Sequence, residues 1–181
     1  YMFSGIQGFD ALLTKGIPKG VNIILEGNAG SGKTIFSLQM LKHHASQGKK
    51  CLFISFEESK DQLINHMNEF GWNPEELLES GNLVIKRYLT SEIYYEEDRQ
   101  NNSVQAMMAK NSSHLLLDLE PFIIGDEGFK PDITVIDSLT AIASTFQDKP
   151  EGYRFYLERL FRFFESLVST NFLITEPTGI A

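Results

Sequence analysis

The sequence has little cysteine, and it lacks any long apolar run. Cys51 is the single cysteine in 181 residues, which excludes an internal disulfide framework and a zinc site built from several cysteines. A chain with so little cysteine suits a reducing compartment. No stretch approaches about 18 uninterrupted apolar residues, and no charged-then-apolar leader opens the chain. We therefore expect no membrane span and a cytoplasmic location.

Basic residues are also in deficit. The chain carries 16 lysines and arginines against 24 aspartates and glutamates, so its formal charge is −8. Residues 1–90 hold nine of each sign, and the whole excess of acid lies in residues 91–181. This balance argues against a protein that clamps nucleic acid, because such proteins need a basic stripe. One local basic loop could still serve, so DNA binding stays open.

Length and composition otherwise describe one globular domain. Hydrophobic residues make up 42% of the chain and charged residues 22%, which excludes a mostly disordered chain, a collagen and a coiled coil. A chain of this length buries roughly 70% of its unfolded surface, enough for a core without disulfides or metal. We expect residues 1–181 to form a single domain.

Short apolar runs alternate with segments of helical periodicity. We expect strands at 21–26, 51–56, 83–85, 132–137 and 171–176. We expect helices at 32–47, 60–70, 74–79, 104–119, 139–143 and 151–169. This alternation predicts an α/β fold with a mainly parallel sheet and helices on both of its faces.

The most specific motif is Gly27-Asn28-Ala29-Gly30-Ser31-Gly32-Lys33-Thr34. It matches the phosphate-binding loop G-x-x-x-x-G-K-[ST], and it lies between a predicted strand and a predicted helix. Glycines let backbone N–H groups wrap the phosphates, and the helix directs its N-terminus at the anion. We expect Lys33 to neutralise the β- and γ-phosphates in binding and catalysis, and the Thr34 hydroxyl to bind Mg²⁺. Ile35 completes the predicted nucleotide-binding segment.

Asp137 ends the apolar strand predicted at 132–137. An apolar strand that ends in aspartate has the Walker B form, whose carboxylate holds Mg²⁺. Strands also end in aspartate to cap the next helix, and Asp137 or Ser138 could cap a helix here. Beside a phosphate-binding loop, the pattern predicts a second metal ligand at Asp137.

Glu57 and Glu58 follow the strand predicted at 51–56. They could form a solvated acidic loop, or one of them could be the general base that orients water against the γ-phosphate. The carboxyl ends of parallel strands face the ligand in such folds. If the strand persisted to Glu58, only one of the two side chains could face the nucleotide. Their geometry alone does not choose between them.

These motifs resemble, in their order along the chain, the KaiC-like ATPases of the RecA superfamily, which include archaeal KaiC paralogues. The similar segments are 4–13, 16–20, 27–34, 53–59, 135–140 and 173–176, and the resemblance covers 4–88 and 131–176. It implies a RecA-type core that binds ATP and Mg²⁺, with Glu57 as the base and Glu58 in support. It also implies a hexameric ring with nucleotide at the subunit interfaces.

Residues 173–176 resemble a core strand of this family. The resemblance places that strand between two others: the strand before the phosphate-binding loop and the strand that ends at Asp137. It also places later strands, and basic residues that complete a neighbouring subunit's site, beyond residue 181. We therefore expect the 181 residues alone to bind ATP but to hydrolyse it poorly. On the helix at 151–169, Phe155 falls opposite the apolar face beside Arg159 and Arg162. That combination is typical of a subunit contact, although a single exposed aromatic is also ordinary.

The sequence thus predicts an Mg²⁺-dependent ATPase that acts as a nucleotide-controlled ring. Two alternatives remain: a RecA-type recombination mediator that binds DNA, and a scaffold that ATP locks without turnover. Phosphoryl transfer to protein also stays open, and the sequence does not identify protein partners.

Overall fold

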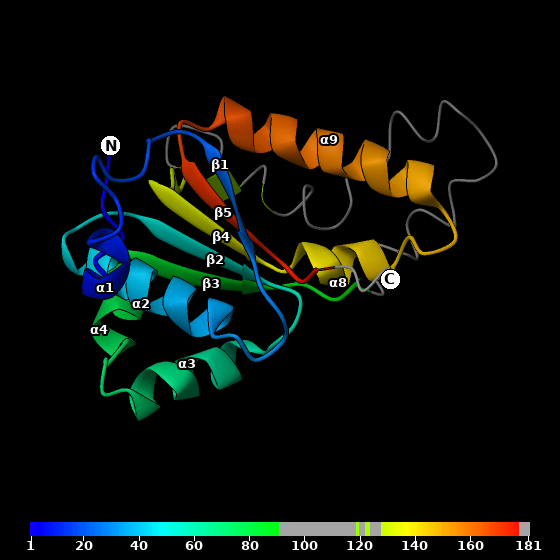
Figure 1. The fold of residues 1–181 in the computed structure, drawn as a ribbon. Helices are drawn as coiled ribbons and strands as arrows, with labels where there is room; N and C mark the ends of the chain where they lie inside the picture. Colours follow the sequence, from blue (N-terminus) through cyan, green and yellow to red (C-terminus); the bar gives the residue numbers. More distant parts are fainter. Residues whose placement is uncertain (91–118, 120–121, 124–127, 178–181) are drawn as a thin grey trace.

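A parallel five-stranded sheet forms the centre of the molecule. The computed structural model describes residues 1–90, 119, 122–123 and 128–177, and its strand order is β1-β5-β4-β2-β3 (Figure 1). The strands are β1 (Asn22–Glu26), β2 (Cys51–Ser55), β3 (Leu83–Arg87), β4 (Ile133–Asp137) and β5 (Thr170–Thr175). All four pairings are parallel, which confirms the predicted α/β fold.

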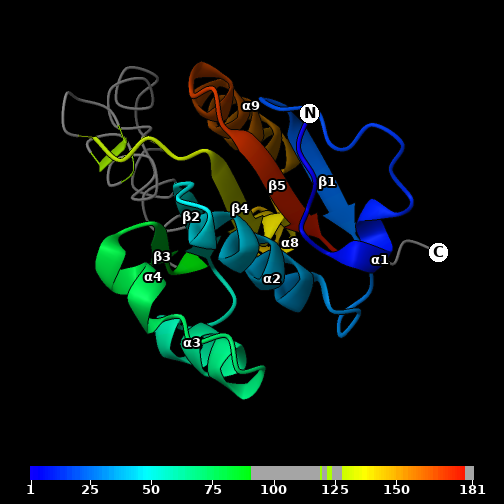
Figure 2. The same cartoon turned by 90° about the vertical axis from the view of Figure 1, so that its left-hand side faces the viewer.

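Helices cover both faces of this sheet, as predicted. They are α1 (Gln7–Asp10), α2 (Lys33–Ser46), α3 (Lys60–Glu69), α4 (Glu75–Ser80), α8 (Leu139–Ser144) and α9 (Pro150–Ser166). The first four lie on one side of the sheet and α9 on the other (Figures 1 and 2). Across the described part of the chain, no helix has the length and apolarity needed to cross a membrane. Apart from residue 119, the helix predicted at 104–119 lies outside the described residues.

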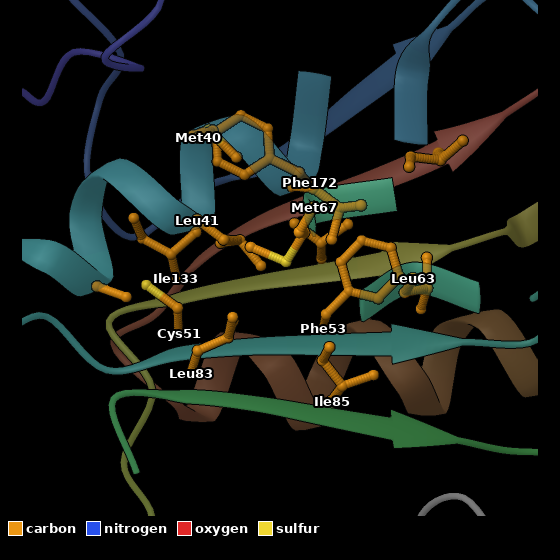
Figure 3. Close-up of a cluster of buried hydrophobic side chains, with 14 of the residues drawn as sticks. Met40, Leu41, Cys51, Phe53, Leu63, Met67, Leu83, Ile85, Ile133 and Phe172 are labelled. Carbon is orange, nitrogen blue, oxygen red and sulfur yellow. The ribbon is translucent and has the colours of Figure 1, made fainter. Parts of the chain in front are cut away.

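The hydrophobic core has two layers, one on each face of the sheet. Between the sheet and helices α2 and α3, side chains such as Leu41, Phe53 and Met67 are fully buried (Figure 3). On the opposite face, Tyr156 and Phe164 of α9 pack against the sheet. Every residue of β2 and β4 is buried, because these strands are covered on both faces. Continuous apolar runs in the sequence therefore marked them correctly as strands.

The register of the sheet brings the ends of separate strands level with one another. β5 lies between β1 and β4, as the family resemblance implied, and pairs Glu26 with Thr175. β2 pairs Ser55 with Asp137 of β4. The segments that follow these strands, including the predicted phosphate-binding loop, therefore emerge at one carboxyl edge.

Helix α9 ends earlier than its apolar pattern predicted. Its last residue is Ser166 rather than residue 169, because the backbone of Leu167 is already extended and leads toward β5. Val168, which falls inside the predicted helix and continues its apolar period, is 96% exposed. Phe155 does lie outside, as predicted, and the Arg159 guanidinium is 6.0 Å from the centre of its ring.

Candidate nucleotide and metal site

The loop between β1 and α2 has the backbone geometry of a phosphate cradle. Gly30 and Gly32 have φ angles of +79° and +89°, a left-handed conformation that favours glycine. A Cβ on Gly27 would lie 2.6 Å from the Ser31 hydroxyl, so a larger residue there would displace the Ser31 side chain. Gly32 precedes α2 without a side-chain cap, and the helix's first N–H groups face the loop. This end of α2 suits an anion.

Lys33 places its ammonium group at the centre of the loop. Its Nζ donates hydrogen bonds to the carbonyl oxygens of Gly27 and Asn28, the latter at 2.8 Å, and to the Ser31 hydroxyl at 3.2 Å. These contacts keep a positive charge beside the N-terminus of α2. Gly27, Asn28 and Ser31 therefore support Lys33, whereas Ala29 and Gly30 line the neighbouring cleft.

Thr34 and Asp137 meet across 103 positions of sequence. The Thr34 hydroxyl donates a hydrogen bond of 2.7 Å to Oδ2 of Asp137, whose side chain lies at the end of β4 and is 3% exposed. Burial raises the pKa of Asp137 to about 6, with the Thr34 hydrogen bond opposing this rise and the charges of Glu57 and Glu58 adding to it. A hydroxyl and a crowded carboxylate at this distance are suitable ligands for a divalent cation.

Glu57 and Glu58 turn toward different partners. Because β2 ends at Ser55, strand alternation does not separate the two side chains, and both line the cleft. The Ser138 hydroxyl donates a 2.7 Å hydrogen bond to Oε1 of Glu57. Glu58 instead lies 3.0 Å from Nε2 of His66 in α3. The two carboxylates therefore have different surroundings, which the sequence alone could not reveal.

These groups surround one cleft of about 370 Å³ at the carboxyl edge, called here the carboxyl-edge cleft. Its lining is Ala29, Gly30, Gly32, Lys33, Thr34, Ile35, Glu57, Glu58, His66, Asp137, Ser138, Ile174 and Glu176. Sequence reasoning missed Ser138, His66, Ile174 and Glu176 as lining residues. Ser138 and Glu176 lie at the ends of predicted strands, where a search of strand ends could have found them. His66 is brought in by the packing of α3, and no motif marks it.

The donor set fits a magnesium-bound nucleotide. The φ angles of the glycines and the open N-terminus of α2 suit phosphate oxygens, and Lys33 adds a cation. Thr34 and Asp137 could hold Mg²⁺, which would offset the repulsion among the carboxylates of Asp137, Glu57 and Glu58.

Comparison with known proteins identifies the family to which the chain is similar. The family model "ATPase: KaiC" matches residues 2–180. The circadian clock oscillator protein KaiC of Prochlorococcus marinus is 37% identical over 83 residues, which cover 45% of this chain and 17% of that protein. A UPF0273 protein of Methanopyrus kandleri is 30% identical over 173 residues, which cover 96% of this chain and 66% of that protein.

A solved structure agrees with the fold. The crystal structure of a KaiC-like protein from Pyrococcus horikoshii superposes with a TM-score of 0.70 at 27% identity, covering 99% of this chain and 71% of that one. The chain spans less than two thirds of the length of the two curated relatives, the KaiC and UPF0273 proteins.

Proposed function

Because this chain belongs to the KaiC-like ATPases of the RecA superfamily, we propose that it binds ATP with Mg²⁺ and hydrolyses it. The observation that carries the proposal is the meeting of Thr34 and Asp137 at 2.7 Å beside Lys33. Two residues that are distant in sequence thus join the N-terminus of α2 to the end of β4. A strand-end cap for α8 would not need Thr34, since Ser138 already caps that helix through the N–H of Ala141.

The phosphate-binding loop and Lys33 bind the phosphates in this proposal. The N–H groups at the start of α2 and the Lys33 ammonium hold the β- and γ-phosphates, where charge-assisted hydrogen bonds are strong. Thr34 and Asp137 hold Mg²⁺, which supplies neutralisation of the phosphate charge when it is bound. Lys33 would exchange its hydrogen bonds to the loop for hydrogen bonds to phosphate.

Glu57 acts as the general base. Its carboxylate is exposed to the cleft and is oriented by the Ser138 hydroxyl. A water beside it attacks the γ-phosphorus, the bond between that phosphorus and the bridging oxygen of ADP breaks, and Glu57 takes the water's proton. Orientation of the base by a fixed hydroxyl limits the loss of entropy on reaching the reactive geometry.

We further propose that residues 1–181 form one ATPase domain and that turnover needs neighbouring subunits in a ring. Charge develops on the γ-phosphate in the transition state, and an additional cation there is worth about 10³–10⁵ in rate. Among the described residues that line the cleft, Lys33 is the one lysine or arginine. A neighbouring subunit would supply the missing cation.

Turnover of ATP as a function of protein concentration tests this proposal. For the whole protein, as opposed to residues 1–181 alone, we expect hydrolysis that needs Mg²⁺ and whose specific activity rises with concentration as rings form. Binding of ATP without turnover at any concentration would instead support a nucleotide-locked scaffold. Strong, salt-sensitive stimulation by DNA would support the recombination mediator. Turnover that is independent of concentration in a monomer would refute the need for a neighbour.

A further inference from the structure

His66 reaches the carboxyl-edge cleft from the last turn of α3. Its Nε2 lies 3.2 Å from Oε1 and 3.0 Å from Oε2 of Glu58, and each side chain is about one third exposed. An ionised carboxylate only accepts hydrogen bonds, so Nε2 of His66 carries the proton and donates. The imidazole therefore holds the end of the Glu58 side chain at the rim of the cleft.

The helix that carries His66 is anchored directly beside the two glutamates. Ser59 caps α3 by accepting a 3.2 Å hydrogen bond from the N–H of Gln62, while the Gln62 side chain accepts one of 2.8 Å from the N–H of Ser59. Leu63 and Met67 of the same helix are fully buried in the core. The start of α3 and its apolar face thus fix where the imidazole of His66 lies.

The main chain of Glu58 is held as well. Its N–H donates a 3.1 Å hydrogen bond to the Ser55 hydroxyl, which in turn donates one of 2.7 Å to the Glu58 carbonyl. Ser55 is fully buried at the end of β2. Glu58 is therefore restrained at its backbone by Ser55 and at its carboxylate by His66, whereas Glu57 contacts Ser138.

We propose that His66 is a positioning residue for ATP hydrolysis, which holds Glu58 aside so that Glu57 alone faces the attacking water. The proposal rests on the function proposed above. Without His66, the Glu58 carboxylate would be free to compete with Glu57 for the Ser138 hydroxyl and for water. It would also be free to turn its negative charge toward Asp137 and Glu176, which line the same cleft.

The test compares His66→Ala, His66→Gln and Asn68→Ala in steady-state ATP hydrolysis. Asn68 lies on the same helix and is exposed, so it controls for the stability of α3. We expect His66→Ala to lower kcat by about 10-fold to 100-fold, the scale of positioning errors. We expect KM for ATP to change by less than about twofold, because the ground-state contacts of the phosphates remain. His66→Gln should recover part of the loss, since its side-chain amide can still donate to Glu58.

A double-mutant cycle shows whether His66 acts through Glu58. In a Glu58→Gln background, His66→Ala should lower kcat by less than about twofold, because the carboxylate that it controls is gone. The proposal is overturned if His66→Ala leaves kcat unchanged. It is equally overturned if the loss is the same in both backgrounds, or if Asn68→Ala causes the same loss.

A second readout does not depend on hydrolysis. In ¹⁵N–¹H spectra, Glu58→Gln should shift the imidazole signals of His66, while Asn68→Ala should leave them unchanged. If the wild-type protein does not hydrolyse ATP but the imidazole signals shift, the proposed function fails and the pairing of His66 with Glu58 stands. If the signals do not shift, the pairing itself is refuted.

Discussion

Strand β4 has an aspartate at each end, and the two residues behave differently. Asp132, just before the strand, is exposed and accepts a 2.8 Å hydrogen bond from the N–H of Lys50. Asp137, at the other end, is buried, bonded to Thr34 and crowded by other carboxylates. Asp132 accepts a hydrogen bond from a neighbouring loop. Asp137 lies near the negative charges of Glu57 and Glu58, which the positive charge of Lys33 only partly offsets.

The contrast extends to the two edges of the sheet. A second hollow of about 390 Å³, the amino-edge hollow, lies where the strands begin and is lined in part by Lys19, His44, Lys49 and Asp132. It is as large as the carboxyl-edge cleft, yet it adjoins the C-terminal end of α2, where the helix dipole disfavours anions. The comparison teaches that the direction of the strands and helices, rather than the size of a hollow, selects the edge that suits a nucleotide.

Replacing one lysine at each edge of the sheet should give the largest difference in ATP affinity. Lys33→Ala should weaken ATP binding by about 10-fold to 100-fold, because a charged hydrogen-bond partner of the phosphates is worth about 1.5–3 kcal/mol. Lys49→Ala, at the amino-edge hollow, should leave ATP affinity unchanged. Calorimetric titration with ATP and Mg²⁺ measures both. Equal affinity of Lys33→Ala and wild type would refute the phosphate-binding loop.

Substitutions of the two glutamates of the cleft should have different effects on ATP turnover. Glu57→Gln keeps the shape of the side chain and its contact with Ser138 but loses the base, so kcat should fall by about 100-fold with ATP binding retained. Glu58→Gln should lower kcat less. Initial rates at saturating ATP, together with calorimetry, provide the measurement. An active Glu57→Gln beside an inactive Glu58→Gln would reverse the assignment.

The aspartates that bracket β4 offer a matched pair for the metal. Asp137→Asn should raise the Mg²⁺ concentration needed for half-maximal turnover by about 10-fold, because a charged oxygen ligand is replaced by a neutral one. Asp132→Asn should leave that concentration unchanged, since the Asp132 carboxylate accepts its hydrogen bond from the N–H of Lys50 at the opposite end of the strand. A magnesium titration of ATPase activity compares the two, and identical curves would remove Asp137 from the metal site.

The smallest effect should come from His44, at the amino edge. Its imidazole is 7% exposed and donates from Nε2 to the Phe3 carbonyl at 2.7 Å. Burial lowers the pKa of His44 below its ordinary value of 6.5, with the Phe3 contact opposing this. The unfolded chain therefore binds more protons than the folded one just below pH 6.5, and stability is lost as the pH falls through that range.

Thermal unfolding at several pH values checks this expectation. The Tm of the wild type should fall more on acidification from about pH 7.5 to about pH 5.5 than the Tm of His44→Gln, which cannot gain the proton. A steeper fall in His44→Gln would contradict it. ATP affinity at neutral pH should be equal in the two proteins.

Sequence patterns predicted the positions of the five strands well, and the fully buried strands β2 and β4 read as continuous apolar runs. The burial of β1 could not be predicted in this way, because its apolar run lies at an edge of the sheet and its residues are exposed or half-buried. The patterns predicted the end of α9 less well, because Leu167 and Val168 continue the apolar period although the backbone has already left the helix. The loop, Thr34 and Asp137 could be predicted from motifs with known chemistry. The roles assigned to them stay predictions.

The surroundings of Glu57 and Glu58 could not be predicted from the sequence. Strand alternation applies only while a strand continues, and β2 ends at Ser55, whose hydroxyl binds the Glu58 backbone. His66 reaches Glu58 across eight positions because α3 starts directly after the two glutamates and packs beside them, and no motif in the sequence marks this contact.

A structure of the protein with Mg²⁺ and a non-hydrolysable ATP analogue tests the central claim most directly. We expect the Thr34 hydroxyl and the Asp137 carboxylate to bind the ion, directly or through water, and Lys33 to contact the phosphates. We also expect Glu57 beside the γ-phosphate, with Glu58 still paired to His66. A complex in which Asp137 points away from the metal, or in which the nucleotide lies elsewhere on the protein, would contradict it.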